Sequence, residues 1–205
     1  MPSGLLPALT DWLYAISTAL LAPVIVLELA LLAWTLAMSG GFTREYFERR
    51  PMRRRLAAAL EAARQAAEPA AVWDAIRIIR HGLPARLAVA CAGDLDSRPL
   101  AAKALADLES DVTGSLARLS FATRVGPMLG LMGTLIPLGP ALTGLAAGNL
   151  AELSSNLVVA FTTTVVGLAI SCLGYGMGLA RRVWYRRDLD DLEFLIERIF
   201  SEEAA

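Results

Sequence analysis

The chain has 205 residues, of which 56% are hydrophobic and 19% charged, and its formal net charge at pH 7 is −1. This composition is too apolar for an ordinary soluble domain and too charged for a chain buried wholly in lipid, so apolar and polar stretches must be segregated. The near-zero net charge gives no reason to expect a nucleic-acid partner. The sequence contains no phosphate-binding loop, nucleophile motif or metal-ligand spacing, so we expect no enzyme activity, no metal site and no bound cofactor.

The first apolar segment occupies residues 12–38 and follows a short N-terminal stretch, residues 1–11. It exceeds the roughly 7–15-residue core of a signal peptide and has no basic flank before it, so we expect it to remain as a transmembrane helix. Pro23 can introduce a kink in this helix. Glu28 is the one ionisable residue in the middle of a predicted span. Because such residues are costly in lipid, this carboxyl is a functional candidate, and the alternative is a hydrogen bond to a neighbouring helix.

Residues 39–124 form a long polar region rich in alanine, leucine and arginine, with several helix breakers, of which Pro51 is the first. High helix propensity between the breakers predicts a set of short helices. Nothing breaks the chain from Pro99 to Gly126, so we expect the second membrane helix to begin far before its apolar segment. The short helices are expected at about 52–67, 70–80 and 84–92.

Two further apolar segments, residues 125–146 and 157–180, are joined by a polar hairpin at 147–156. Each is close to the roughly 20 residues that a helix needs to cross a bilayer. Small and polar residues recur at steps of three and four, which places them on one face of each helix and lets membrane helices approach closely. They are Gly126, Gly130, Gly133, Pro137, Pro140 and Gly144 in the first segment, and Asn156, Ala160, Thr163, Gly167, Ser171, Gly174 and Gly178 in the second.

Threonines stand at position 134 and at three consecutive positions, Thr162, Thr163 and Thr164. Two interpretations of these hydroxyls remain open. They can bond the carbonyl one turn back and serve packing alone. They can also line a narrow path and solvate a passing ion, because neither apolar segment contains an ionisable acid or base of its own.

The C-terminal stretch, residues 181–205, is charged but keeps apolar residues on one broad face, which predicts an amphipathic helix that continues the third span. The Arg and Asp residues from Arg186 to Asp191 are expected to form a solvated face with ion pairs along the helix. The sequence therefore predicts an all-α membrane protein with three transmembrane helices, the second and third extended into a cytoplasmic helical bundle.

Arginines follow the first and third apolar segments directly, whereas the N-terminus and the hairpin contain no Lys or Arg. Because positive residues favour the cytoplasmic side, we expect residues 39–124 and 181–205 inside and the N-terminus and hairpin outside. An alternative role for the arginines is a contact with membrane lipid.

The string Gly-Leu-Met-Gly-Thr at 130–134, followed by a polar hairpin and by Thr-Thr-Val-Val-Gly-Leu at 163–168, resembles the MotA/TolQ/ExbB proton channel family. The resemblance implies a subunit of the cytoplasmic (inner) membrane that forms a homo-oligomer, a pentamer, around a dimer of a single-span partner of the ExbD/TolR/MotB kind. A transmembrane aspartate of that partner carries the ion. Thr134 and Thr164 match the threonines that face this aspartate, and the three-span, N-out layout is similar to the TolQ/ExbB branch.

The chain departs from the family pattern at two positions. Exb and Tol members carry a glutamate five residues before the second threonine, where this chain has Val159, and Pro137 replaces a glycine found in many members. The extra hydroxyl of Thr163 is similar to sodium-driven members, so the transported ion is expected to be H⁺ or Na⁺. The candidate ion-pathway residues are Thr134, Thr164, Thr163, Asn156 and Ser171, with Glu28 as a possible intramembrane carboxylate and Pro127, Pro137 and Pro140 as residues that shape the path by freeing backbone carbonyls.

The expected function is an ion-conducting subunit that couples the ion-motive force to movement of the partner. The alternative, from a different class, is a non-conducting membrane scaffold that anchors another protein.

Overall fold

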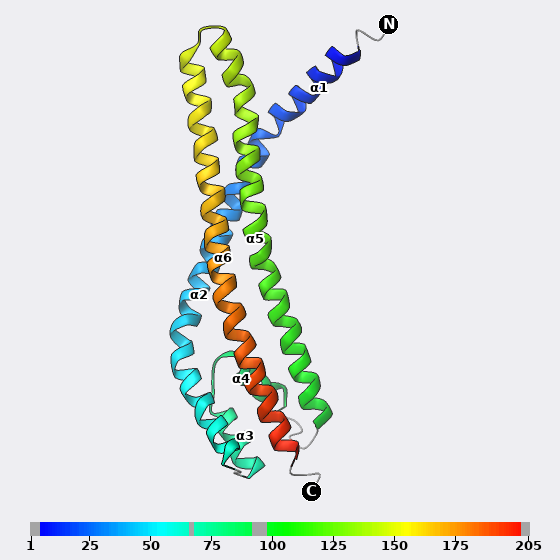
Figure 1. Ribbon diagram of the computed structural model, residues 1–205, viewed down its shortest axis with the longest axis vertical. Coiled ribbons are helices and arrows are strands. Elements are labelled where there is room, and N and C mark those ends of the chain that lie inside the picture. The colour runs from blue at the N-terminus through cyan, green and yellow to red at the C-terminus, as the bar shows by residue number, and fades with distance from the viewer. Residues whose placement is uncertain (1–4, 66–67, 92–97, 202–205) are drawn as a thin grey trace. The chain divides into compact units, whose positions relative to one another are not determined.

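The computed structural model describes residues 5–65, 68–91 and 98–201, which form six helices and no strand (Figure 1). Within these residues, three helical stretches are long and apolar enough to cross a membrane: Ala8–Arg64, Arg98–Ala146 and Leu150–Phe200. The prediction of an all-α fold with three candidate membrane helices is confirmed. The helices are α1 (Leu5–Ala19), α2 (Leu21–Arg64), α3 (Pro69–Arg77), α4 (Gly82–Ala90), α5 (Arg98–Ala146) and α6 (Leu150–Ser201).

The chain divides into two compact units, and α2, α5 and α6 each contribute residues to both. Unit 1 consists of Met1–Ser39 and Leu119–Gly176, and it contains the apolar segments. Unit 2 consists of Gly40–Arg118 and Met177–Ala205, and it contains α3, α4 and most of the charged residues.

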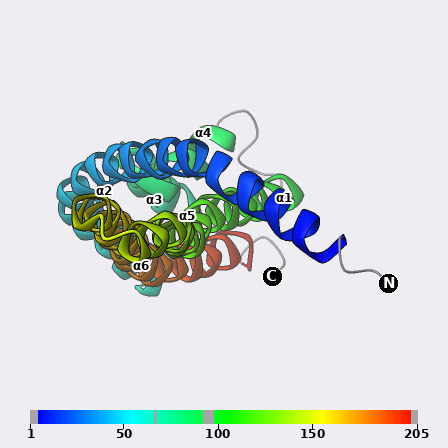
Figure 2. The same ribbon diagram turned by 90° about the horizontal axis from the view of Figure 1, so that it is seen from above.

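The first apolar segment of unit 1 is interrupted at Leu20, where α1 ends and α2 begins. Pro23 lies in the first turn of α2, and it has no N–H to donate to the carbonyl of Ala19. The Leu20 N–H is shared between the carbonyls of Ile16 and Ser17, at 3.1 Å each. The kink predicted at Pro23 is therefore present, and the axis of α1 is inclined to that of the first turns of α2 (Figures 1 and 2).

Pro51 does not break the chain: α2 continues through it to Arg64. The prediction of a separate helix at 52–67 is therefore wrong. Pro51 is exposed; it removes the hydrogen bond to the carbonyl of Phe47 and its ring crowds that carbonyl. The residues that follow, including Met52 and Leu56, are buried in the core of unit 2, and this packing offsets the cost of the proline.

The second apolar segment lies within one uninterrupted helix, α5, which begins at Arg98, as predicted. The turn after α5 uses Gly148, whose φ of +75° is a left-handed conformation that glycine adopts without strain. Asn149 then caps α6: its Oδ1 accepts a hydrogen bond from the Glu152 N–H at 3.2 Å, and its Nδ2 donates to Glu152 Oε2 at 3.0 Å. This reciprocal pair resembles a capping box, and it explains the single charge in the hairpin.

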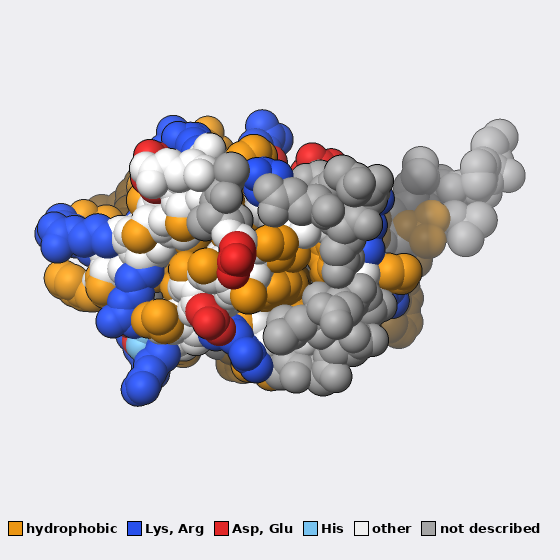
Figure 3. Space-filling model, turned by 90° about the horizontal axis from the view of Figure 1, so that it is seen from below, with side chains coloured by type: hydrophobic (Ala, Val, Ile, Leu, Met, Phe, Trp, Pro, Cys, Tyr) orange, Lys and Arg blue, Asp and Glu red, His pale blue; other side chains and the backbone are white. Residues whose placement is uncertain are grey.

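The core of unit 2 is apolar and draws on α2, α3, α4, α5 and α6. The amphipathic face predicted after the third span is confirmed, because Leu192, Leu195 and Ile199 are at most 4% exposed. The short helices α3 and α4 supply Ile76 and Leu87, which are fully buried. Figure 3 shows Lys and Arg side chains spread around this end of the chain, with hydrophobic side chains between them.

Candidate functional site

The small-residue faces of α5 and α6 pack against each other in unit 1, where they form a contact line that we call the α5–α6 seam. A Cβ atom placed on Gly126 would lie 2.8 Å from the carbonyl oxygen of Gly167, and one placed on Gly130 would lie 3.0 Å from that of Thr163. On Gly174, a Cβ would lie 2.9 Å from Thr123 Oγ1. Side chains at these positions would force the backbones apart, so the glycines set the helix spacing.

Thr163 lies inside the seam and is only 6% exposed. Its side chain fills the space beside Gly133, where a Cβ would come within 2.6 Å of Thr163 Oγ1. The hydroxyl donates to the Ala160 carbonyl at 2.9 Å. Thr163, which the sequence predicts to line the ion path, therefore packs between α5 and α6.

Thr134 and Thr164 lie at the margin of the same seam and remain partly exposed. The Cα of Thr164 would lie 3.4 Å from a Cβ on Gly130, which is one turn before Thr134 on α5. Thr134 Oγ1 donates to the Leu131 carbonyl at 2.7 Å, and Thr164 Oγ1 donates to the Ala160 carbonyl at 3.2 Å. A hydroxyl that donates to its own helix keeps its lone pairs for an outside group, so both oxygens can still accept a hydrogen bond or a cation.

Ser171 and Pro127 act as a pair across the seam. Pro127 has no N–H, so the Thr123 carbonyl one turn earlier on α5 loses its helical donor. Ser171 Oγ, from α6, donates to that carbonyl at 2.9 Å. The structure thus gives these two predicted site residues a shared packing role.

The other predicted residues occupy separate places on the three helices. Pro137 is almost fully buried and Pro140 half-buried, both inside α5, which remains helical through them. Asn156 is half-buried on α6, two turns before Thr163. Glu28, from α2, is 2% exposed and approaches Gly167 of α6, where a Cβ would lie 3.2 Å from its Oε1.

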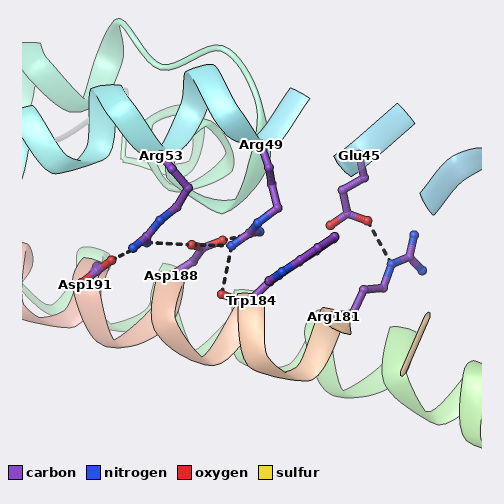
Figure 4. Close-up of polar contacts among 7 residues, drawn as sticks. All are labelled: Glu45, Arg49, Arg53, Arg181, Trp184, Asp188 and Asp191. Carbon is purple, nitrogen blue, oxygen red and sulfur yellow. Dashed lines mark hydrogen bonds and ion pairs between the residues drawn. The ribbon is translucent and has the colours of Figure 1, made fainter. Parts of the chain in front are cut away.

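Unit 2 holds an ion-pair network that the sequence analysis missed (Figure 4). Asp188 of α6 is fully buried between two arginines of α2: Arg49 lies 2.8 Å and Arg53 3.2 Å from its carboxylate oxygens. Arg53 also pairs with Asp191 at 2.6 Å. The expectation that Arg186 to Asp191 form a solvated face is wrong at Asp188, whose partners come from another helix rather than from its own.

Aromatic and acidic groups extend this network along α2 and α6. The guanidinium of Arg49 lies 4.9 Å from the centre of the Trp184 ring, and it donates to the Trp184 carbonyl at 3.2 Å. Arg181 pairs with Glu45 at 2.9 Å. These contacts hold the two helices in register within unit 2.

The surroundings of the network change the pKa of two of its groups. Burial raises the pKa of Asp188, and the guanidiniums of Arg49 and Arg53 oppose this shift. Burial, together with a hydrogen bond to Glu45, raises the pKa of the Tyr185 phenol. The network therefore joins α2 and α6 within unit 2 through ion pairs.

Three long apolar helices, two of them joined through small-residue faces, define a multi-pass helical membrane protein. A family model described as the MotA/TolQ/ExbB proton channel family matches residues 43–180. The chain belongs to this family of membrane channel subunits, which confirms the resemblance drawn from the two threonine strings. No curated protein and no solved structure matches the chain.

Proposed function

We propose that the chain is the ion-conducting subunit of a motor complex in the cytoplasmic membrane, which couples a proton or sodium gradient to movement of a single-span partner. Membership of the proton channel family supports the general class. The observation that carries the proposal is the state of Thr134 and Thr164: both are partly exposed at one seam, and both oxygens keep free lone pairs.

In the proposed complex, copies of this chain form a homo-oligomer, a pentamer, with the margins of their α5–α6 seams turned toward the partner helices. A bare charge costs several kcal/mol in the bilayer core, so an ion and the partner's aspartate need polar neighbours there. Thr134 and Thr164 supply oxygen acceptors at that depth, with Asn156 as a further polar group. The N-terminus and the hairpin face the outside, since the arginines flank the opposite ends of the spans.

A second candidate function, a non-conducting scaffold, is favoured by one observation. Every hydroxyl of the threonine triplet, Thr162 to Thr164, is already bonded to a carbonyl of its own helix, as expected of threonines that only pack. In addition, Val159 supplies no carboxylate to α6.

Ion flux through the intact complex separates the two functions. The chain is co-expressed with its single-span partner, and cytosolic pH and sodium are followed in wild type and in Thr134→Val/Thr164→Val at equal membrane abundance. Conduction predicts a flux that falls at least tenfold in the double variant. Thr162→Val is the matched control, because this threonine is exposed, back-bonded at 2.7 Å and turned about 200° from Thr164 on the helix. A partner that binds while no ion moves supports the scaffold instead.

A further inference from the structure

Glu28 occupies the buried face of α2 in the middle of the first apolar segment. This face consists of Val24, Glu28, Leu31 and Thr35, which are spaced by four, three and four residues and are at most 8% exposed. Glu28 lies ten residues before Met38, the last residue of the apolar segment. At about 1.5 Å per residue this is about 15 Å, half the thickness of the hydrocarbon core. The carboxyl is therefore placed at the depth where a charge is most costly.

The Glu28 carboxyl lies against the α5–α6 seam at Gly167, which has no side chain. Gly167 of α6 sits against the carbonyl of Gly126 of α5, which would lie 2.6 Å from a Cβ at Gly167. The same Cβ would lie 3.2 Å from Glu28 Oε1. Three helices thus converge at Gly167, and only a residue without a side chain leaves room there for the carboxyl.

Glu28 Oε1 is buried and has no hydrogen-bond partner of normal geometry among the residues that the structure describes. The backbone N–H of Gly167 lies near the carboxyl and only partly offsets the cost of burying its charge. The segments that face it, 126–146 of α5 and 157–180 of α6, contain no Lys, Arg, His, Asp or Glu. The nearest cation in the sequence of α5 is Arg124, which is exposed, and on α2 it is Arg44, four turns away. A permanent carboxylate at this place would be unpaired, which proteins rarely tolerate.

We propose that Glu28 is a proton-binding group of the conduction path, supplied by α2 in place of the carboxylate that α6 lacks at Val159. This inference rests on the proposed function. On loading, an O–H bond forms between the carboxylate and an incoming proton. On release the same bond breaks and the proton leaves toward the opposite side, so no other reactant is consumed.

Glu28 lies near the proposed path, and its surroundings fit a proton better than a metal cation. Gly167 follows Thr163 by four residues and Thr164 by three, so Glu28 lies about one helical turn from the hydroxyls of the seam. A metal cation needs several oxygen ligands at once, whereas a proton needs only one oxygen. Oε1 is a single oxygen without a hydrogen-bond partner of normal geometry. The family match begins at residue 43, so this role is carried by the structure of α2 rather than by the match.

Proton binding is tested on the assembled complex in membrane vesicles with dicyclohexylcarbodiimide, an apolar reagent that modifies protonated carboxyls, followed by peptide mass spectrometry. We expect an adduct on Glu28 that declines as pH rises, while Glu152, exposed in the hairpin, stays unmodified. An acid that is merely structural and never exchanges its proton would give labelling that does not change with pH. Absence of the adduct at every pH overturns the proposal.

Participation in conduction is tested in the same vesicles by proton flux. Glu28→Gln keeps the shape of the side chain but cannot exchange a proton, so we expect at least a tenfold loss of flux at equal assembly, with partial recovery in Glu28→Asp. Thr35→Val is the matched control, because Thr35 is equally buried on the same face but does not titrate. If wild type conducts and Glu28→Gln conducts equally, this inference fails while the proposed function stands. If wild type conducts nothing with the partner bound, the proposed function fails, and this inference fails with it.

Discussion

The hydrogen bond from Ser171 to the Thr123 carbonyl allows a quantitative prediction of stability. Pro127 has no N–H, so this carbonyl depends on the donor from Ser171. In Ser171→Ala the carbonyl loses its side-chain donor, and Pro127 has already removed the helical donor. Interhelical hydrogen bonds in membranes contribute about 0.6 kcal/mol on average and up to about 1.7 kcal/mol. Because this hydrogen bond is half-buried, we place its loss in the middle of that range. We therefore expect Ser171→Ala to lower the free energy of unfolding by about 1 kcal/mol.

The effect of Ser171→Ala on the free energy of unfolding depends on whether Pro127 is present. In Pro127→Ala the restored N–H bonds the Thr123 carbonyl, so Ser171→Ala should then cost about zero, and the coupling in the double-mutant cycle should be about 1 kcal/mol. The assay is equilibrium unfolding of the purified chain in lipid–detergent bicelles, titrated with denaturing detergent and followed by tryptophan fluorescence. Ser154→Ala is the control, because Ser154 is an exposed serine near the N-terminus of α6. An equal cost of Ser171→Ala in both backgrounds refutes the reasoning.

Two further predictions concern packing in the two units. Gly133→Ala should destabilise unit 1 by about 1–3 kcal/mol, because the new Cβ falls within 2.6 Å of both Cβ and Oγ1 of Thr163. Thr163→Gly, which removes both atoms, should reverse much of this loss in the same unfolding assay, whereas Thr163→Ala keeps the Cβ and should not. Arg49→Leu should destabilise unit 2 by about 3 kcal/mol, because it removes one of two cations from the buried Asp188; Arg44→Ala, in an exposed pair, should leave hydrogen exchange of unit 2 unchanged.

The helical framework could be predicted because long apolar runs and small-residue spacing act locally. The break at Pro51 could not, because propensity counts a proline as a helix breaker wherever it falls, while in this chain the proline is exposed and buried neighbours continue the helix. Packing that decides such a case is tertiary information, absent from a window of sequence. A proline that is followed by buried apolar residues can therefore lie inside a helix, as Pro51 does in α2.

The burial of Asp188 could have been predicted from the spacing of the residues around it, although not from their composition. Tyr185, Asp188, Leu192 and Leu195 follow one another at steps of three, four and three, which places the aspartate in the apolar row of α6. Glu28 lies in the same kind of row on α2. An acid on the apolar face of an amphipathic helix is better interpreted as buried and paired, or buried and functional, than as part of a solvated face.

The threonine triplet shows why a sequence motif does not assign one role to all its members. Neighbouring residues on a helix point about 100° apart, so three consecutive side chains cannot share one face. In α6, Thr163 fills the space beside Gly133, Thr162 is exposed on the far side, and Thr164 remains at the margin of the seam. Of these three threonines, only Thr164 combines a polar oxygen with partial exposure beside α5. The packing of Thr163 thus fixes the rotation of α6, and in the proposed ion path this rotation decides which hydroxyl faces the ion.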